Sequence, residues 1–232
     1  MEVRVTKLLA IVDVRVLSIR EEPLSKAILL DWDGVLCDSL VLYFELYQEA
    51  CRRHQKPFPI QTLDEFRRWY NPRWEQNYYD LGFSEAEFQE VLIFSQSHLQ
   101  YSKAQLFEAI PETLKRWAEL YPLAIVSTTP SDVIRARLAA SDLDSLFKVY
   151  TGGEDGCSAK REKVAKTLST LGVSQGVMVG DTPLDVDAGQ HNHLKTVGVS
   201  YGWVTAERIQ ESRPDRVVDG PSQLFQAVLD LL

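Results

Sequence analysis

Two aspartates separated by a single residue are the first sign of chemistry in this chain of 232 residues. Asp31 and Asp33 follow an apolar run at residues 28–30, which is typical of a buried parallel strand. Gly34 then lets the backbone turn sharply. Because two carboxylates at a buried strand end repel each other, we expect a divalent cation to offset their charge. A polar turn without function is the competing interpretation of these residues alone.

A second pair of carboxylates follows another apolar run, at residues 176–179. Asp181 stands at the expected strand end, and Asp185 lies one helical turn further along. This pair could complete a metal site with Asp31 and Asp33. Taken alone, it could also be a helix cap and a solvated carboxylate.

Hydroxyl groups follow a third apolar run, at residues 123–126. Ser127 and Thr128 precede an expected helix that begins near residue 131. Hydroxyls and free N–H groups at a helix start suit an anion, phosphate above all, although a plain helix cap is the alternative.

Two lysines lie near the start of an expected helix over residues 158–171, and alone they would be ordinary surface charges. Helical steps from Lys160 reach Val164 and Leu168, an apolar stripe that must face the sheet. The same steps from Lys163 follow a mostly polar edge, which we expect to face water. The helical phase therefore favours Lys160 as the lysine that reaches the strand ends.

The elements that position these groups form a regular pattern from residue 110 onward. The expected strands are 123–126, 147–150, 176–179, 195–199 and 216–218, and the expected helices are 112–120, 131–140, 158–171, 183–191 and 222–231. Alternating strands and helices predict an α/β fold, a Rossmann-like parallel sheet with helices on both faces. Ligands of such sheets bind at the carboxyl ends of the strands, where the polar groups are found.

A helical and unusually aromatic segment interrupts this pattern, and no strand-like run is visible between Asp38 and Ile110. We therefore expect a catalytic core of residues 27–38 and 110–232, with an inserted helical cap at 39–109. Residues 1–26 form an appendage without an assigned role, in which alternation suggests a strand or a hairpin arm.

The overall composition excludes several classes of function. A net charge of −8 without basic runs argues against a nucleic-acid partner. No apolar run is long enough to span a membrane. Cys37, Cys51 and Cys157 are irregularly spaced, which suits a reducing, cytoplasmic compartment better than disulfides. The oligomeric state is not indicated.

Four motifs in order resemble those of the haloacid dehalogenase superfamily of phosphatases. They are Asp-Trp-Asp-Gly-Val at 31–35, Ser127, a lysine at 160 or 163, and Gly-Asp-Thr-Pro-Leu-Asp at 180–185. The helical insert is similar in position to the mobile cap of phosphoglycolate phosphatase-like and β-phosphoglucomutase-like members. The resemblance extends from residue 28 to about residue 203.

The resemblance implies a role for each site residue. Asp31 would attack phosphorus and form an aspartyl-phosphate, and Asp33 would serve as the acid and then the base. The carboxylates of Asp31 and Asp181 and the carbonyl of Asp33 would hold Mg²⁺, with Asp185 orienting a bound water. The phosphate would be bound by Ser127, Thr128 and Lys160.

The sequence thus predicts a Mg²⁺-dependent phosphatase for a small phosphorylated metabolite, a phosphomonoester like phosphoglycolate. A sugar phosphomutase shares the core motifs and stays an alternative, as does a non-catalytic phosphate-binding module. The presence of Asp33 argues against a dehalogenase or a phosphonatase. In the cap, residues 67–70 (Arg-Arg-Trp-Tyr) are the favoured candidates for substrate recognition.

Overall fold

The computed structural model describes residues 26–232, apart from the side chains of residues 97 and 98. The expected appendage at 1–26 therefore lies outside the described residues except for Lys26, which begins the first strand. Among the described helices, none is long and apolar enough to cross a membrane.

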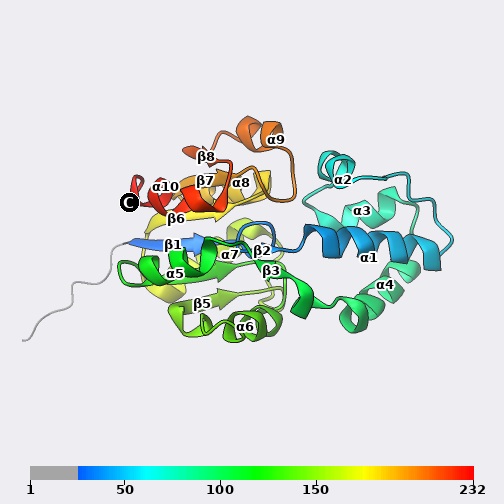
Figure 1. Cartoon of the computed structure of the whole chain (residues 1–232), viewed down its shortest axis with the longest axis horizontal. Helices are drawn as coiled ribbons and strands as arrows, with labels where there is room; N and C mark the ends of the chain where they lie inside the picture. The colour runs from blue at the N-terminus through cyan, green and yellow to red at the C-terminus, as the bar shows by residue number, and fades with distance from the viewer. Residues whose placement is uncertain (1–25) are drawn as a thin grey trace, which may run out of the picture.

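A six-stranded parallel sheet forms the centre of the core, with the strand order β5-β4-β1-β6-β7-β8 (Figure 1). The strands are β1 (Lys26–Leu30), β4 (Leu123–Val126), β5 (Phe147–Thr151), β6 (Gln175–Gly180), β7 (Lys195–Val199) and β8 (Arg216–Val218). Strand β1 lies in the middle of the sheet and is paired on both sides. Its carboxyl end therefore meets those of β4 and β6 at the same edge.

Alternating residues of β1 point to opposite faces of the sheet. Ile28 and Leu30 pack in one apolar cluster with residues of α5 (Ile110–Ala118), α6 (Ser131–Ala139) and α10 (Leu224–Leu229). Ala27 and Leu29 pack on the other face, against α7 (Lys160–Leu171) and α8 (Pro183–His191). The predicted α/β fold with helices on both faces is confirmed.

The expectation of no strand between Asp38 and Ile110 was wrong. The two-residue strands β2 (Cys37–Asp38) and β3 (Gln105–Leu106) pair antiparallel, and a pair this short shows no periodic pattern in the sequence. This ribbon carries both chain connections between the sheet and the helical insert.

Other short elements also lacked a sequence signal. Helix α9 (Ala206–Glu211) was not expected, α7 begins at Lys160 rather than at residue 158, and the closing helix starts as a 3₁₀ turn. The 3₁₀ turns are η1 (Tyr101–Lys103), η2 (Asp144–Leu146) and η3 (Pro221–Gln223).

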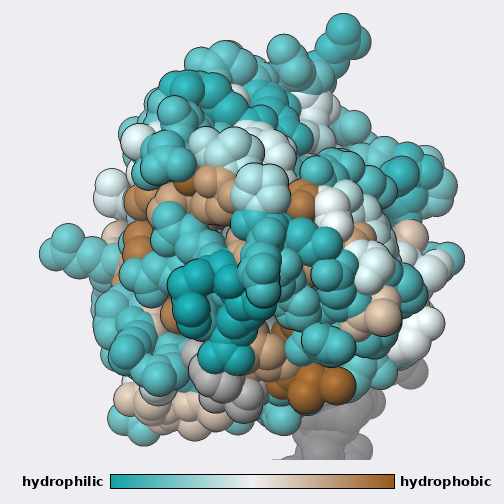
Figure 2. Space-filling model, turned by 90° about the vertical axis from the view of Figure 1, so that its right-hand side faces the viewer, coloured by the Kyte–Doolittle hydropathy of each residue, from teal (hydrophilic) through white to brown (hydrophobic). Residues whose placement is uncertain are grey.

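The insert consists of four helices beside the strand ends, on the right in Figure 1. They are α1 (Leu40–Arg53), α2 (Leu63–Trp69), α3 (Trp74–Asp80) and α4 (Glu85–His98). Capping boxes at Thr62 and Ser84 fix the starts of α2 and α4. The aromatic residues pack inward around Phe66, while the outer face is mostly hydrophilic (Figure 2).

The apolar cluster of the insert continues into the core. Trp203, Val204 and Ile209, which follow β7, belong to the same cluster as the helices of the insert. Arg208 Nη1 donates a hydrogen bond of 2.7 Å to the carbonyl of Tyr70, at the carboxyl end of α2. The core segment around α9 therefore holds α2 in place.

Replacing Arg208 tests this attachment. We expect Arg208→Ala to weaken the docking of α2 by about 1 kcal/mol, because the last carbonyls of the helix lose a charged donor. Hydrogen exchange measured by mass spectrometry should then be about fivefold faster in residues 63–70 and unchanged in β1. Arg135→Ala is the control: it removes an exposed arginine that pairs with Asp144 in the core and should leave hydrogen exchange in α2 unchanged. Equal protection of α2 in all three proteins would contradict the attachment.

Candidate active site

Three buried carboxylates meet where β1 and β6 end. Oxygen atoms of Asp31, Asp181 and Asp185 all lie within 4.8 Å of one another. Lys160 Nζ lies 2.9 Å from Asp31 Oδ1 and 2.9 Å from Asp185 Oδ1. The lysine is the first residue of α7, so the ends of β1 and β6 and the first turns of α7 and α8 all contribute to one cluster.

Backbone groups fix the orientation of each carboxylate. The N–H of Trp32 donates to Asp31 Oδ1 at 2.7 Å, and the N–H of Trp203 donates to Asp181 Oδ2 at 2.7 Å. Asp185 is the third residue of α8, and its Oδ2 accepts hydrogen bonds from the backbone and the hydroxyl of Thr182. The three side chains are thus held before any ligand binds, which is a condition for precise chemistry.

Two glycines leave the space that these carboxylates occupy. Gly34 has a φ of +75°, and a Cβ there would lie 2.1 Å from Asp181 Oδ2. A Cβ on Gly180 would lie 1.9 Å from the Cβ of Asp185. Any larger residue at either position would displace a carboxylate, which explains why glycine stands beside each acidic motif.

Burial controls the charge state of the cluster. Burial raises the pKa of Asp31 to about 7, although the ammonium of Lys160 acts in the opposite direction. Burial and the neighbouring carboxylates of Asp185 and Asp31 raise the pKa of Asp181 well above its usual value. Burial would lower the pKa of Lys160, but the same two carboxylates raise it, so the lysine stays charged.

The donor set fits a hard divalent cation. Three carboxylates face a single ammonium, so the cluster has more negative than positive charge in a buried place. Carboxylate oxygens are the ligands that Mg²⁺ prefers, and few of them are needed because Mg²⁺ keeps several waters. Asp31 and Asp181 could hold the ion, with Asp185 beside it.

Asp33 lies apart from this cluster in a ring of hydroxyl groups. Its Oδ2 accepts a hydrogen bond of 2.6 Å from Thr129 Oγ1, and its Oδ1 accepts one of 2.8 Å from the hydroxyl of Tyr101. Burial raises the pKa of Asp33, and the hydroxyls of Ser39, Thr129 and Tyr101 oppose that effect. A carboxylate so held suits proton transfer rather than metal binding.

The hydroxyl motif is arranged around Ser127 and Thr129. The backbone N–H of Ser127 bonds the carbonyl of Thr151, and Ser127 Oγ accepts from the N–H of Thr129. Ser127 is buried at the end of β4, whereas the side chain of Thr128 is exposed. The sequence analysis proposed Ser127 and Thr128 but not Thr129, whose hydroxyl bonds Asp33.

The two lysines of α7 have different partners. Lys160 reaches the carboxylates, as the helical phase suggested, whereas Lys163 Nζ donates to the carbonyl of Gly152 and to Asp155 Oδ1. The expectation that the Lys163 side of the helix faces water was wrong, because Lys163 and Thr167 are both buried. The loop after β5 supplies the partners of Lys163, whereas the hydroxyl of Thr167 bonds that of Thr151 at the end of β5.

Besides Thr129, sequence reasoning missed Tyr43, Tyr101 and Trp203. Tyr101 and Tyr43 come from the insert, and their hydroxyls are 2.6 Å apart, so that Tyr43 can donate to Tyr101 and Tyr101 to Asp33. Trp203 comes from the loop after β7. The aromatic content of residues 39–109 was a signal for the tyrosines, but it did not say which of them turn toward the core.

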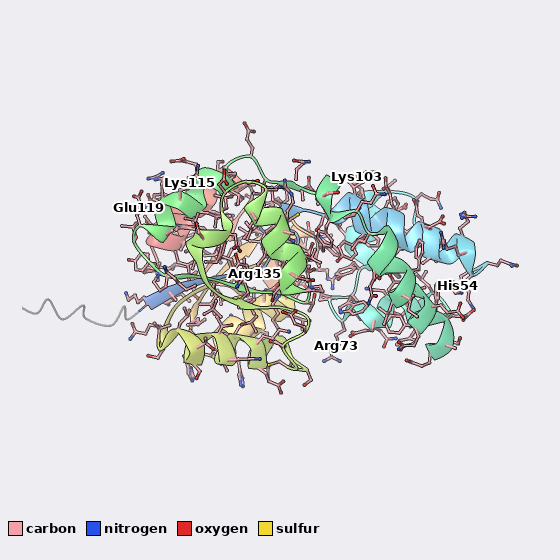
Figure 3. All side chains as sticks on the ribbon, turned by 90° about the horizontal axis from the view of Figure 1, so that it is seen from below. His54, Arg73, Lys103, Lys115, Glu119 and Arg135 are labelled. Carbon is pink, nitrogen blue, oxygen red and sulfur yellow. The ribbon has the colours of Figure 1, made fainter. Side chains whose placement is uncertain are left out.

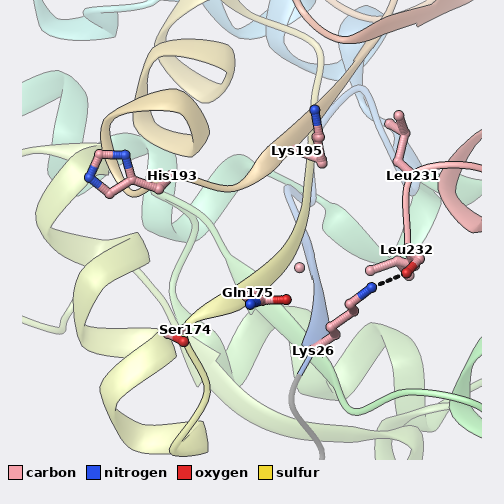
Figure 4. A pocket seen from close by; sticks show the side chains of 8 residues that line it. Lys26, Ser174, Gln175, His193, Lys195, Leu231 and Leu232 are labelled. Carbon is pink, nitrogen blue, oxygen red and sulfur yellow. Dashed lines mark hydrogen bonds between the residues drawn. The ribbon is translucent and has the colours of Figure 1, made fainter.

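A cavity of about 500 Å³ lies at the opposite edge of the sheet and is not part of this site (Figure 4). Its lining includes Lys26, Gln175, Lys195 and Leu232, which belong to the amino ends of three strands and to the chain end. The carboxylates lie at the carboxyl ends of the strands.

Comparisons with known proteins agree with this arrangement. The sequence model of a family described as haloacid dehalogenase-like hydrolase matches residues 28–199. Pyrophosphatase PpaX from Listeria welshimeri is 26% identical over 210 residues, covering 88% of this chain and 96% of that protein. Phosphoglycolate phosphatase from Synechococcus elongatus is 26% identical over 218 residues, covering 89% and 99%. A haloacid dehalogenase-like hydrolase from Streptococcus pneumoniae has a similar structure, with a TM-score of 0.77, 20% identity and coverage of 87% and 97%.

If this cluster binds Mg²⁺, the stability of the folded protein should depend on both pH and Mg²⁺. Because the folded-state pKa of Asp31 lies at about 7 and its ordinary value is 3.8, the metal-free protein loses stability as the pH rises between these values. Mg²⁺ needs the deprotonated carboxylates, so it should stabilise more at pH 7.5 than at pH 5. At a hundred times Kd the gain should be about 2.7 kcal/mol, or roughly 5 to 10 °C in Tm.

Calorimetry with and without Mg²⁺ at both pH values measures this effect. Asp181→Asn should lose the gain, and Asp230→Asn, which removes an exposed carboxylate paired with Arg216, should keep it. An equal Tm increase at the two pH values, or one that survives Asp181→Asn, would exclude this cluster as the metal site.

Proposed function

Because the chain belongs to the haloacid dehalogenase-like hydrolase family, we propose that it is a Mg²⁺-dependent phosphatase that acts on a small phosphorylated metabolite. The observation that carries this proposal is the pairing of two different carboxylates on one strand end. Asp31 lies in the acidic cluster 2.9 Å from Lys160, while Asp33 is held by the hydroxyls of Thr129 and Tyr101. One carboxylate is placed for attack and the other for proton transfer.

The reaction has two displacements at phosphorus. In the first, a carboxylate oxygen of Asp31 forms a bond to phosphorus and the bond to the leaving oxygen breaks, while Asp33 gives that oxygen a proton. In the second, Asp33 takes a proton from a water that attacks phosphorus, and the bond to Asp31 breaks. Asp33 returns to its protonated form, and Asp31 is regenerated as a carboxylate.

The remaining groups hold the phosphoryl oxygens. Lys160 already contacts Asp31, so its ammonium would lie beside a phosphoryl group that is bonded to Asp31. Ser127 offers a hydroxyl at the end of the neighbouring strand, and Thr128 follows it as a further candidate. Mg²⁺ bound by Asp31, the Asp33 carbonyl and Asp181, beside Asp185, would neutralise phosphate charge.

The insert supplies the roof of the site. We assign residues 27–38 and 110–232 to the catalytic core and residues 39–109 to the cap, since β2 and β3 carry both connections. Closure of the cap would keep water out until substrate is bound. Tyr101 lies just before β3, so a movement of the ribbon would also move the hydroxyl that holds Asp33.

The burial of the nucleophile supports a small substrate. Asp31 is only 8% exposed, so the site suits a small phosphomonoester of about the size of phosphoglycolate. The pyrophosphatase and the phosphoglycolate phosphatase named above also act on small phosphate compounds, according to their names. Release of free phosphate would distinguish this activity from a mutase.

The nucleophile can be tested by a single substitution. We expect Asp31→Asn to abolish Mg²⁺-dependent release of phosphate from p-nitrophenyl phosphate, because an amide cannot form the aspartyl-phosphate. The fold should remain, because burying an amide costs less than burying a carboxylate. Circular dichroism checks the fold, and Asp230→Asn is the matched control with full activity. A folded Asp31→Asn protein with normal turnover would disprove the assignment.

Alanine substitutions of Lys160 and Lys163 test which lysine binds the phosphate. Lys160→Ala should lose at least about tenfold in kcat/KM, equal to about 1.4 kcal/mol of transition-state binding. Lys163→Ala breaks a buried ion pair with Asp155 and should lower Tm, but the folded fraction should keep kcat/KM near the original value. Activity must therefore be normalised to folded protein. The reverse order of the two kcat/KM values would transfer the role to Lys163.

A further inference from the structure

Tyrosines of the cap cover the side of the site where a leaving group must lie. The rings of Tyr43 and Tyr70 pack against Trp203, with centroid distances of 4.7 and 4.9 Å. The backbone N–H of the same tryptophan holds Asp181, and the hydroxyl of Tyr101 reaches Asp33. Tyr43, Tyr70 and Tyr101 thus form an uncharged surface on the cap side of the carboxylates.

Tyr70 differs from the other two tyrosines in its hydroxyl. Tyr43 and Tyr101 bond each other, and Tyr101 also bonds Asp33, so their hydroxyls are engaged. Tyr70 is 7% exposed, and within residues 26–232 its hydroxyl has no hydrogen-bond partner. Burial raises the pKa of Tyr70, and the carboxylates of Asp181, Asp33 and Asp31 add to this increase, so the side chain lies within reach of their charge. The oxygen of Tyr70 is not among the fully buried atoms without a partner, so the hydroxyl keeps accessible surface and is free to exchange a hydrogen bond with a ligand.

The basic residues of the cap are directed elsewhere. Arg67 donates to the carbonyl of Tyr201 and lines a separate cavity of about 250 Å³ between α2 and α9. Arg73 and Lys103 are exposed and lie at opposite margins of the molecule (Figure 3). The others pair with acidic residues of the cap itself: Arg52 and Arg53 with Glu49, Lys56 with Glu87, and Arg68 with Asp64. Among the described side chains of the cap, none offers a cation to the site.

We propose that the phosphatase selects phosphomonoesters with an uncharged, hydroxylated leaving group, such as a polyol or a sugar, and that Tyr70 hydrogen-bonds this group. The proposal rests on the phosphatase function and narrows its substrate class. It also assigns the recognition role within residues 67–70 to the tyrosine rather than to the arginines.

The charge balance explains why an anionic leaving group is rejected. The carboxylate of phosphoglycolate, or the second phosphate of pyrophosphate, would be buried beside Asp33 and below uncharged tyrosines. Without a cation it would lose its hydration and gain no partner. A neutral hydroxyl can instead exchange a hydrogen bond with Tyr70, and it does not repel the carboxylates.

Steady-state kinetics with four substrates test this proposal. They are glycerol 3-phosphate as the polyol ester, phosphoglycolate, pyrophosphate, and p-nitrophenyl phosphate as a measure of the chemistry alone. We expect kcat/KM for glycerol 3-phosphate to exceed that for phosphoglycolate and for pyrophosphate by at least about tenfold. A preference for either anionic leaving group, with p-nitrophenyl phosphate turned over, would overturn the selectivity and leave the phosphatase function intact.

A matched pair of variants tests the role of Tyr70. Tyr70→Phe should lower the ratio of kcat/KM for glycerol 3-phosphate to that for p-nitrophenyl phosphate by about tenfold, the loss of one hydrogen bond to a buried group. Tyr78→Phe removes a hydroxyl from the same aromatic cluster, where Tyr78 stacks on Tyr47, and should leave the ratio unchanged. An unchanged ratio in Tyr70→Phe would remove this residue from the proposal.

If no substrate is turned over, measurements of ligand binding can still test the selectivity separately from the phosphatase function. Titration calorimetry of Asp31→Asn with Mg²⁺ should show tighter binding of glycerol 3-phosphate than of phosphoglycolate. That result without turnover in the unmodified protein would contradict the phosphatase function and support the selectivity. Tighter binding of phosphoglycolate would contradict the selectivity whatever the activity.

Discussion

The mutual repulsion of buried carboxylates is the constraint on which this structure depends. Asp31, Asp181 and Asp185 lie together at 8%, 2% and 1% exposure, and burial alone would drive such groups to take up protons. Lys160 offsets part of the charge by contacting two of them. Backbone N–H groups and the capping box at Thr182 hold the acids in place, so the residual charge is available for a cation and its phosphate.

The parallel sheet makes this concentration of charge possible. Strand β1 is central, and its neighbours β4 and β6 end at the same edge, so residues roughly 100 to 150 positions apart in the sequence meet there. The glycines at positions 34 and 180 let the backbone come close enough for the carboxylates to share one space. Trp203 belongs to the apolar cluster of the helical insert, and its backbone N–H holds Asp181, so the packing of the insert is connected to the carboxylate cluster.

Much of the core was predictable from the sequence, because its signals are local. Apolar runs of strand length and helical stripes identified the sheet, and the acidic motifs stand directly after two of those runs. The helical phase of α7 singled out Lys160 for the same reason. The burial of Lys163 was not predictable, since its partners lie in a loop that the helix pattern does not describe. Likewise, the contacts of Tyr101, Trp203 and Arg208 depend on how cap and core pack, which no periodicity encodes.

The central claim is that Asp31 carries the phosphoryl group during turnover. Borohydride added during turnover with Mg²⁺ reduces an acyl phosphate to an alcohol, and peptide mass spectrometry then locates the altered residue. The account predicts conversion of Asp31 to homoserine, dependent on both substrate and Mg²⁺. Conversion of Asp33 or Asp181 instead, or turnover that leaves every aspartate unmodified under conditions that reduce a known aspartyl-phosphate, would contradict it.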